Sequence, residues 1–345
     1  MIGEKMINIA FVDWWQGFNK EENFITNTLR ELQVDFSVID SKQRIKEVDF
    51  VFCSLMGNDF LEYDCPRILF VGENCIPDFN LYDYGIGFAR MEFADRYIRY
   101  PLYAAYYRDA CKKASGRTSI TDDEIAAKKF CAMVVSNGDN TDGYREKLFD
   151  ELSKNEKVDS GGRYRNNIGK PEGVENKNRF LNGYKFSLAC ENTNAPGYIT
   201  EKIVEAYAAG TIPIYWGAGD VVEDFNEKAF INCNDFMSEK DVADYVIKIN
   251  NDDKLYREIY EQPLWKDGWD EISELDNTFK SWLYSIVTQD KNQYFRRNRC
   301  GWTKTYENDR LTTINIYKKY GGIAHSKFKD RMISIVKILV DAKMK

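Results

Sequence analysis

The sequence predicts an α/β protein with two Rossmann-like domains that face each other across a cleft, followed by a basic helical tail. The length of 345 residues corresponds to roughly two domains of ~150 residues each. Strand-like and helix-like segments alternate in two separate series, which is typical of parallel sheets. The end of the chain differs in charge, because residues 291–345 carry a net charge of +10 while the whole chain carries −7.

The first series predicts a Rossmann-like domain over residues 1–124. Short apolar runs rich in β-formers predict buried strands at residues 7–12, 34–39, 48–53 and 67–71. The spacing of apolar residues predicts a helix over 22–32 and helical character over 102–118, ending at Gly116. The polar stretch that follows marks the boundary between the domains.

The second series predicts a Rossmann-like domain over residues 125–290. Its expected strands are residues 129–135, 184–190, 211–216 and 229–232. Its expected helices are residues 144–154, 200–209 and 238–250. Two such halves describe many enzymes and some binding proteins, so this architecture alone does not determine the function.

Residues 291–345 form the predicted basic tail. Residues 326–345 have the pattern of an amphipathic helix, with an apolar stripe of Phe328, Met332, Ile335, Val336 and Leu339. A basic tail on an acidic body points to an anionic surface, a membrane or a nucleic acid, as its partner. A uniformly acidic protein binds nucleic acid poorly, and we expect a membrane and no nucleic acid. The alternative is a helix that packs on its own domain.

The composition excludes several kinds of site. The single histidine, His325, cannot complete a Cys/His zinc site and lies in the tail, far from any predicted strand end. The eight cysteines include no CxxC pair, which argues against structural zinc and c-type haem. Several of them lie inside apolar runs, where cysteine packs as a small hydrophobic residue, and this favours a reducing compartment. The chain has no DxD sequence and no P-loop. No apolar run predicts a signal peptide or a membrane span, so we expect a cytoplasmic protein, peripheral at the inner face of the membrane.

The most informative segment is residues 184–203. A predicted strand delivers Glu191 and Asn192 at its carboxyl end, where open α/β sheets bind ligands. A helix then opens near residues 198–201, and Lys202 in its first turn is unfavourable to the helix dipole unless a bound anion offsets it. Glu201 can accept hydrogen bonds from a ribose diol. The alternative is a Glu-Lys pair on a solvated helix face.

Two further segments carry candidate residues. Glycines bracket Arg163 and Arg165 in residues 160–169, and an arginine offers a planar fork to phosphate oxygens. The alternative there is a flexible basic surface loop. Glu73 follows the strand at 67–71, and a carboxylate that faces the cleft from this position can act as a general base. The alternative is that Glu73 is a solvated loop residue.

Together these segments resemble the family 10 glycosyltransferases, the α1,3/4-fucosyltransferases, and the short bacterial members most closely. Residues 184–217, which read YKFSLACENTNAPGYITEKIVEAYAAGTIPIYWG, are similar to that family's donor-binding signature. GEN at 72–74, DYGIGF at 83–88 and DRYIRYPLY at 95–103 also fit. The clear likeness spans 70–103 and 158–236, about a third of the chain. Some bacterial relatives carry many heptads before a basic tail, whereas here one degenerate unit at most remains, at 308–317.

The resemblance implies a GT-B fold whose first domain holds the acceptor and whose second holds GDP-fucose. It implies that Glu73 is the catalytic base and that Arg165 and Lys202 stabilise the departing β-phosphate, with no metal and no cofactor. Donor contacts are implied for Asn192, Tyr198 and Glu201. Glu191 is a further candidate donor contact, and Arg163 is an alternative to Arg165.

The function implied is the inverting transfer of L-fucose from GDP-β-L-fucose to O3 of N-acetylglucosamine in a lactosamine-type glycan, giving a Lewis x-type product of the kind found in lipopolysaccharide. The expected partners are GDP-fucose, such a glycan and an anionic membrane surface contacted by the tail. Two alternatives are a GT-B glycosyltransferase that uses another nucleotide sugar and a catalytically silent nucleotide-sugar or glycan-binding protein.

Overall fold

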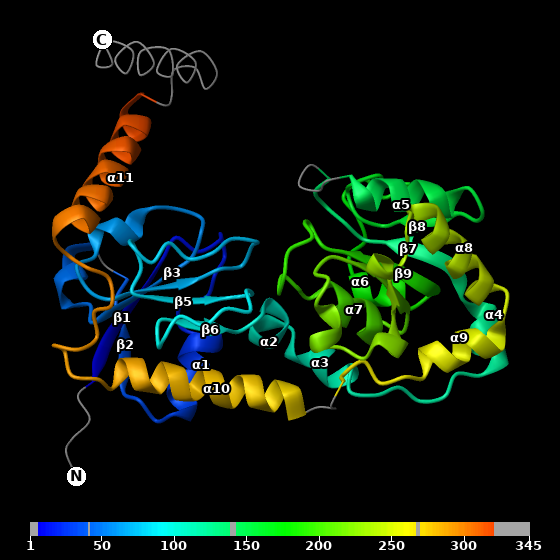
Figure 1. Cartoon of the computed structure of the whole chain (residues 1–345), viewed down its shortest axis with the longest axis horizontal. Helices are drawn as coiled ribbons and strands as arrows, with labels where there is room; N and C mark the ends of the chain where they lie inside the picture. Colours follow the sequence, from blue (N-terminus) through cyan, green and yellow to red (C-terminus); the bar gives the residue numbers. More distant parts are fainter. Residues whose placement is uncertain (1–5, 41, 139–142, 267–269, 321–345) are drawn as a thin grey trace.

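The computed structural model describes residues 6–40, 42–138, 143–266 and 270–320. It contains two α/β domains, each built around a parallel sheet (Figure 1), as the sequence predicts. The six-stranded sheet of the first domain has the order β2-β1-β3-β4-β5-β6. Its strands are β1 (Ile7–Val12), β2 (Phe36–Val38), β3 (Phe50–Cys53), β4 (Arg67–Phe70), β5 (Tyr84–Gly87) and β6 (Tyr97–Arg99).

The second domain contains a five-stranded sheet of order β11-β10-β9-β7-β8. Its strands are β7 (Lys129–Met133), β8 (Val158–Ser160), β9 (Tyr184–Cys190), β10 (Ile212–Trp216) and β11 (Ile231–Asn232). Up to residue 260, the α-helices of the chain are α1 (Phe24–Glu31), α2 (Leu102–Tyr106), α3 (Arg108–Lys113), α4 (Asp122–Ala127), α5 (Tyr144–Ser153), α6 (Lys177–Leu181), α7 (Lys202–Ala208), α8 (Glu239–Asn250) and α9 (Asp253–Tyr260). Every strand pair in both sheets is parallel, so all carboxyl ends of a sheet lie at one edge.

Strands β5 and β6 extend the first sheet beyond the four strands expected from the sequence. Gly85 and Gly87 weaken the strand pattern of β5, yet both are required by close packing. A Cβ atom at Gly85 would lie 2.6 Å from the Pro77 ring, and one at Gly87 would lie 3.0 Å from the Tyr97 hydroxyl. The helix expected over 102–118 is also interrupted, because Tyr107 leaves helical geometry between α2 and α3.

Helix α10 (Asp270–Val287) returns to the first domain, although the expected second domain ran to residue 290. Figure 1 shows it lying along the first domain rather than beside β7–β11. The Phe279 ring stacks on Tyr100 with centroids 4.3 Å apart, and the Tyr100 hydroxyl donates to Asp276 over 2.7 Å. The division of the chain into domains therefore differs from the expected one. Contacts between side chains that are far apart in the sequence assign α10 to the first domain.

The chain after α10 also packs on the first domain. Its basic side chains form ion pairs with acidic side chains of that domain, namely Lys291 with Asp49, Arg296 with Asp95, Arg299 with Asp64 and, buried from solvent, Arg297 with Asp83. In α11 (Gly301–Tyr320), Glu307 forms a buried ion pair with Arg67 at 2.6 Å. Much of the positive charge in this part of the expected tail is therefore paired within the molecule.

Part of the expected tail is helical and packs on the first domain. The single heptad-like unit at 308–317 is part of α11, where Leu311 and Ile314 pack against the apolar cluster of the first domain. The amphipathic helix expected over 326–345 lies outside the described residues. Among the helices that are described, none has the length and apolar character needed to cross a membrane.

A buried charge cluster joins the two domains. Asp224, whose side chain is 3% exposed, follows β10 in the second domain. Its carboxylate accepts hydrogen bonds from Arg90 over 2.6 Å and from Arg99, both in the first domain. The Tyr103 hydroxyl donates a third hydrogen bond over 3.2 Å. One carboxylate thus holds three side chains of the opposite domain.

We expect Asp224→Asn to lower the free energy of unfolding by ~3–5 kcal/mol, because Arg99 loses the buried anion that it pairs with. Arg90 keeps its pairs with Asp220 and Glu223. Urea denaturation measures this. Asp244→Asn is the matched control, since Asp244 pairs with Lys240 on the exposed face of α8 and its loss should cost less than ~1 kcal/mol. Equal effects of the two substitutions would contradict the role given to Asp224.

Candidate active site

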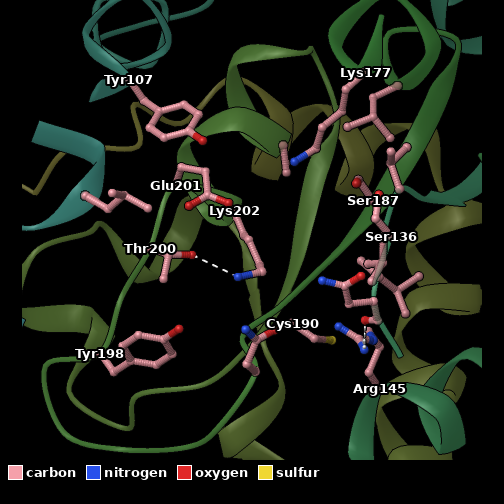
Figure 2. Close-up of a pocket in the computed structure, with 18 of the residues that line it drawn as sticks. Tyr107, Ser136, Arg145, Lys177, Ser187, Cys190, Tyr198, Thr200, Glu201 and Lys202 are labelled. Carbon is pink, nitrogen blue, oxygen red and sulfur yellow. Dashed lines mark hydrogen bonds between the residues drawn. The ribbon is translucent and has the colours of Figure 1, made fainter. Parts of the chain in front are cut away.

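A cavity of about 320 Å³ lies between the domains. The first domain contributes Gly72 and Glu73, which follow β4. The second contributes residues after the carboxyl ends of β7 and β9, which are neighbouring parallel strands. The cavity therefore lies where ligands bind in open α/β sheets. Figure 2 shows the side chains of its second-domain walls, among them Ser136, Arg145, Lys177, Ser187, Cys190, Tyr198, Thr200, Glu201 and Lys202.

The connection from β9 to α7 is organised by Glu191, which is fully buried. Its carboxylate accepts from the backbone N–H and the hydroxyl of Thr200, each over 2.7 Å, and from Lys202 over 2.9 Å. Burial raises the pKa of the Glu191 carboxyl, and these donors oppose that effect by stabilising the ionised form. Glu191 thus lies behind the cavity wall and holds it in shape.

Lys202 presents its ammonium group to the cavity. Besides Glu191, its Nζ contacts the Thr200 hydroxyl over 3.1 Å, the interaction drawn in Figure 2. Burial alone would lower the pKa of Lys202, but the carboxylates of Glu191 and Glu201 outweigh that effect and raise it. The group therefore keeps its positive charge at neutral pH, fixed in position by two protein oxygens.

Arg145, in the first turn of α5, is a second cation of the cavity and one that the sequence analysis missed. Its side chain is 1% exposed, and its Nη2 donates to the Asn137 carbonyl over 3.2 Å. Neither its Nε nor its Nη1 has a hydrogen-bond partner among the described residues. Unpaired guanidinium donors beside a cavity suit an anionic ligand. A basic residue at the start of a helix, the signal used for Lys202, also applies to Arg145.

Lys177 completes the set of cations on this wall. It lines the cavity at the start of α6, and its Nζ contacts Glu205 Oε2 over 2.5 Å. The carboxylate of Glu205 neutralises part of its charge, as Glu191 does for Lys202 and Glu146 does for Arg145. Arg145 differs from the two lysines because two of its guanidinium nitrogens have no hydrogen-bond partner among the described residues.

Arg163 and Arg165 do not line the cavity in this structure. Arg165 takes a left-handed backbone conformation, with φ of 52°, which directs its side chain onto the outside of α5. There it pairs with Asp150 over 2.8 Å and lies over the Phe149 ring. Arg163 is exposed to solvent. The structure thus brings Lys202 into the cavity but leaves both loop arginines outside it.

Glu73 extends from the first domain toward the second and is exposed to solvent. Its Oε2 accepts a hydrogen bond from the Tyr198 hydroxyl over 3.2 Å, across the boundary between the domains. Burial, together with the carboxylates of Glu191 and Glu73, raises the pKa of Tyr198, so its hydroxyl stays protonated and donates. A carboxylate placed this way can accept a proton from a group bound in the cavity.

The remaining predicted donor contacts also lie on the cavity. Asn192 follows β9, and Glu201 immediately precedes α7; both line the wall near Lys202. Their amide and carboxylate groups can bond hydroxyl groups of a ligand. No cluster of three or more His, Cys, Asp or Glu side chains placed to hold a metal ion occurs among the residues that the structure describes.

Two family models match the chain. One, described as the Alpha-(1,3)-fucosyltransferase FucT N-terminal domain, matches residues 9–106. The other, described as Glycosyltransferase family 10 (fucosyltransferase) C-term, matches residues 125–312 and so covers more than half of the chain. The first match lies within the first domain, and the second covers the whole second domain together with α10 and part of α11. Between them they include every predicted site residue.

Among curated proteins, the chain is similar to Alpha-(1,3)-fucosyltransferase FucT of Helicobacter pylori, with 34% identity over 291 residues. The similarity covers 75% of this chain and 60% of that protein, so the chain spans less than two thirds of its relative. It is also similar to Alpha-(1,3)-fucosyltransferase B of Drosophila melanogaster, with 34% identity over 180 residues, covering 47% of this chain and 40% of that one.

Two solved structures are similar to the whole fold. One is titled as an alpha1,3-fucosyltransferase with GDP-fucose, with a TM-score of 0.67, 28% identity, and coverage of 86% of this chain and 95% of that one. The other is titled as the enzyme with GDP, with a TM-score of 0.64, 28% identity, and coverage of 82% and 92%. With two parallel α/β domains and a cavity between them, the chain has a GT-B fold and belongs to glycosyltransferase family 10.

Proposed function

We propose that this protein transfers L-fucose from GDP-β-L-fucose to O3 of N-acetylglucosamine in a lactosamine-type glycan, with inversion at the anomeric carbon and a Lewis x-type product. The observation that carries the proposal is one cavity with Glu73 on its first-domain side and Lys202 and Arg145 on its second-domain side. Family membership and the likeness to solved structures titled with GDP and GDP-fucose support the choice of donor.

In this reaction Glu73 accepts the proton of the acceptor hydroxyl as the acceptor oxygen attacks the anomeric carbon. The bond from that carbon to the β-phosphate oxygen breaks on the opposite face, and GDP departs with the electron pair. Negative charge therefore grows on the β-phosphate, where Lys202 and Arg145 stabilise it. A single in-line displacement converts the β-linkage of the donor into an α-linkage in the product.

Tyr198 has a positioning role in this scheme. Its hydroxyl donates to one carboxylate oxygen of Glu73, which leaves the other oxygen for the acceptor proton. The hydrogen bond also ties the base to the domain that holds the donor. Asn192 and Glu201 bind hydroxyl groups of the donor, with Glu201 on the ribose or the sugar.

The acceptor and its location are part of the proposal. A lipid-linked glycan assembled on the cytoplasmic face of the membrane would place the acceptor at the inner leaflet. The basic residues of 321–345, which include Lys327, Lys329, Arg331, Lys337, Lys343 and Lys345, would then bind anionic lipids. A peripheral cytoplasmic location follows from this proposal.

Calorimetric titration with GDP, combined with assays of donor hydrolysis and transfer, tests the function. We expect GDP to bind and fucose to be transferred to N-acetyllactosamine. Turnover of another nucleotide sugar in place of GDP-fucose would indicate a different donor. Binding of GDP without any turnover would indicate a catalytically silent binding protein.

We expect Glu73→Gln to lower kcat by roughly 10²–10⁴-fold, because the amide cannot accept the acceptor proton. The Kd for GDP should change little, since Glu73 acts on the acceptor side. Steady-state transfer assays and calorimetry measure the two quantities. Glu62→Gln, on an exposed carboxylate of the same domain, is the control, and a Glu73 variant as active as that control would remove Glu73 from the mechanism.

Lys202→Ala and Arg145→Ala should each raise the Kd for GDP by roughly 10-fold or more, because each loses a charged hydrogen bond to phosphate. Calorimetry measures the loss, with thermal unfolding as the check on folding. Arg165→Ala is made in parallel. A comparable loss of GDP affinity in Arg165→Ala would show that Arg165 leaves Asp150 to bind the diphosphate, the role that the family resemblance implies. An unchanged affinity would indicate that Lys202 and Arg145 bind the diphosphate without Arg165.

Transfer activity should be unchanged in excess EDTA. The reason is that cationic side chains are available to the departing phosphate, while the sequence lacks the DxD pair that holds a metal in other glycosyltransferases. Initial rates before and after exhaustive chelation measure this. A complete loss of activity that Mn²⁺ restores would contradict metal-independent catalysis.

A further inference from the structure

Three neighbouring strands of the first sheet are each followed by an exposed, large apolar side chain. Trp15 follows β1 and is 37% exposed, Met56 follows β3 and is 61% exposed, and Ile76 follows β4 and is 58% exposed. Because β1, β3 and β4 are adjacent and parallel, their carboxyl ends lie at one edge of the sheet. The loop of Ile76 also contains Glu73, so these apolar side chains belong to the edge that carries the proposed base.

Asp13 holds together two of the loops that carry these side chains, those of Trp15 and Met56. This residue directly follows β1 and has a left-handed conformation, with φ of 62°, which is uncommon for a residue other than glycine. Its carboxylate accepts hydrogen bonds from the backbone N–H groups of Asp59 and Phe60, each over 2.9 Å. Its carbonyl accepts from the N–H of Met56 over 2.9 Å. The turn that presents Trp15 is therefore fixed to the loop that presents Met56.

The Trp15 ring rests on a layer of aromatic side chains. Trp14 beneath it stacks on Phe70 at 5.5 Å and on Phe18 at 4.0 Å, and its Nε1 donates to the Phe52 carbonyl over 3.0 Å. Trp15 itself makes edge contacts of 5.4 Å with the rings of Trp14 and Tyr106. Tyr106 precedes Tyr107, which lines the cavity. The aromatic layer thus connects the exposed indole to the proposed active site.

The three exposed side chains stand in short segments without charge, and charged residues such as Lys20, Asp59 and Glu73 flank these segments. Residues 14–19, 54–58 and 74–76 include no Lys, Arg, Asp or Glu, but they do include amides such as Gln16. Phosphate groups or anionic lipid headgroups would require cations at such a surface. A neutral pyranose suits it, because a sugar ring has an apolar C–H face that stacks on an aromatic ring and hydroxyl groups that bond amides.

We infer that Trp15, Met56 and Ile76 form the surface on which the glycan acceptor lies, with a pyranose ring stacked on the Trp15 indole. This inference rests on the proposed function and assigns its acceptor site. The surface crosses three strands, a span of ~10 Å between the outer two. It therefore contacts the acceptor beyond the sugar whose hydroxyl reacts at Glu73, and so contributes to selection of the acceptor.

Trp15→Ala should raise the KM for N-acetyllactosamine by roughly 10-fold, a loss typical of an aromatic contact at the centre of a binding site. The KM for GDP-fucose and the Kd for GDP should stay within about two-fold, since donor contacts are unchanged. Trp15→Phe should restore most of the affinity, because a ring remains. Trp302→Ala is the matched control, since Trp302 is exposed on α11, and it should have no effect.

Met56→Ser and Ile76→Ser provide a test that does not depend on the packing of Trp15. Both side chains are largely exposed, so the thermal unfolding midpoint should not change, while the KM for N-acetyllactosamine should rise by a few-fold. An unchanged KM in Trp15→Ala and in both of these variants would overturn the inference. A change only in the oligomeric state, measured by sedimentation, would overturn it in favour of contact with a second copy of the chain.

Ligand-observed NMR with N-acetyllactosamine separates this inference from the proposed function. Binding by the wild type that is lost in Trp15→Ala supports the acceptor site, even if no fucose is transferred and the transferase proposal fails. Transfer to N-acetyllactosamine with equal binding by both proteins supports the function and overturns the acceptor site. Absence of glycan binding by the wild type, in the presence of GDP, also overturns the acceptor site.

Discussion

The cavity depends on the buried carboxylate of Asp224, because its two walls belong to different domains. Asp224 holds Arg90 and Arg99 of the first domain against the second. Glu73 reaches Tyr198 only in that arrangement, and the weak hydrogen bond between them cannot position two domains by itself. A structural charge cluster outside the cavity therefore determines whether the proposed base and the cations that face it occupy one site.

Much of the candidate site could be predicted because it follows from strand ends. The apolar run of β9, the polar residues after it and the helix that follows are local in sequence, and they place Asn192, Glu201 and Lys202 at one sheet edge. Arg145 was missed although it too is a basic residue in the first turn of a helix, because its segment lacks the strand end and polar residues that mark the surroundings of Lys202. Arg165 lies outside the cavity because its left-handed backbone and Asp150 direct its side chain onto α5.

The parts of the fold that could not be predicted depend on contacts between distant segments. Gly85 and Gly87 disrupt the strand pattern of β5, and only the nearby side chains of Pro77 and Tyr97 explain why glycine is required. Likewise, the apolar face of α10 is compatible with either domain. Its assignment to the first domain follows from Tyr100, which is far away in sequence but stacks on Phe279.

The return of the chain through α10 and α11 has a consequence for the order of folding. The second domain is an insertion within the first, whose final ion pairs join residues as far apart as Arg67 and Glu307, separated by 240 positions. During synthesis, the central domain can become compact while the domain that begins the chain still lacks its closing helices. Contacts over such long separations are slow to form. A newly made first domain therefore remains open until α10 and α11 emerge, and removing α11 would damage the domain that contains Glu73 rather than the domain that contains Lys202.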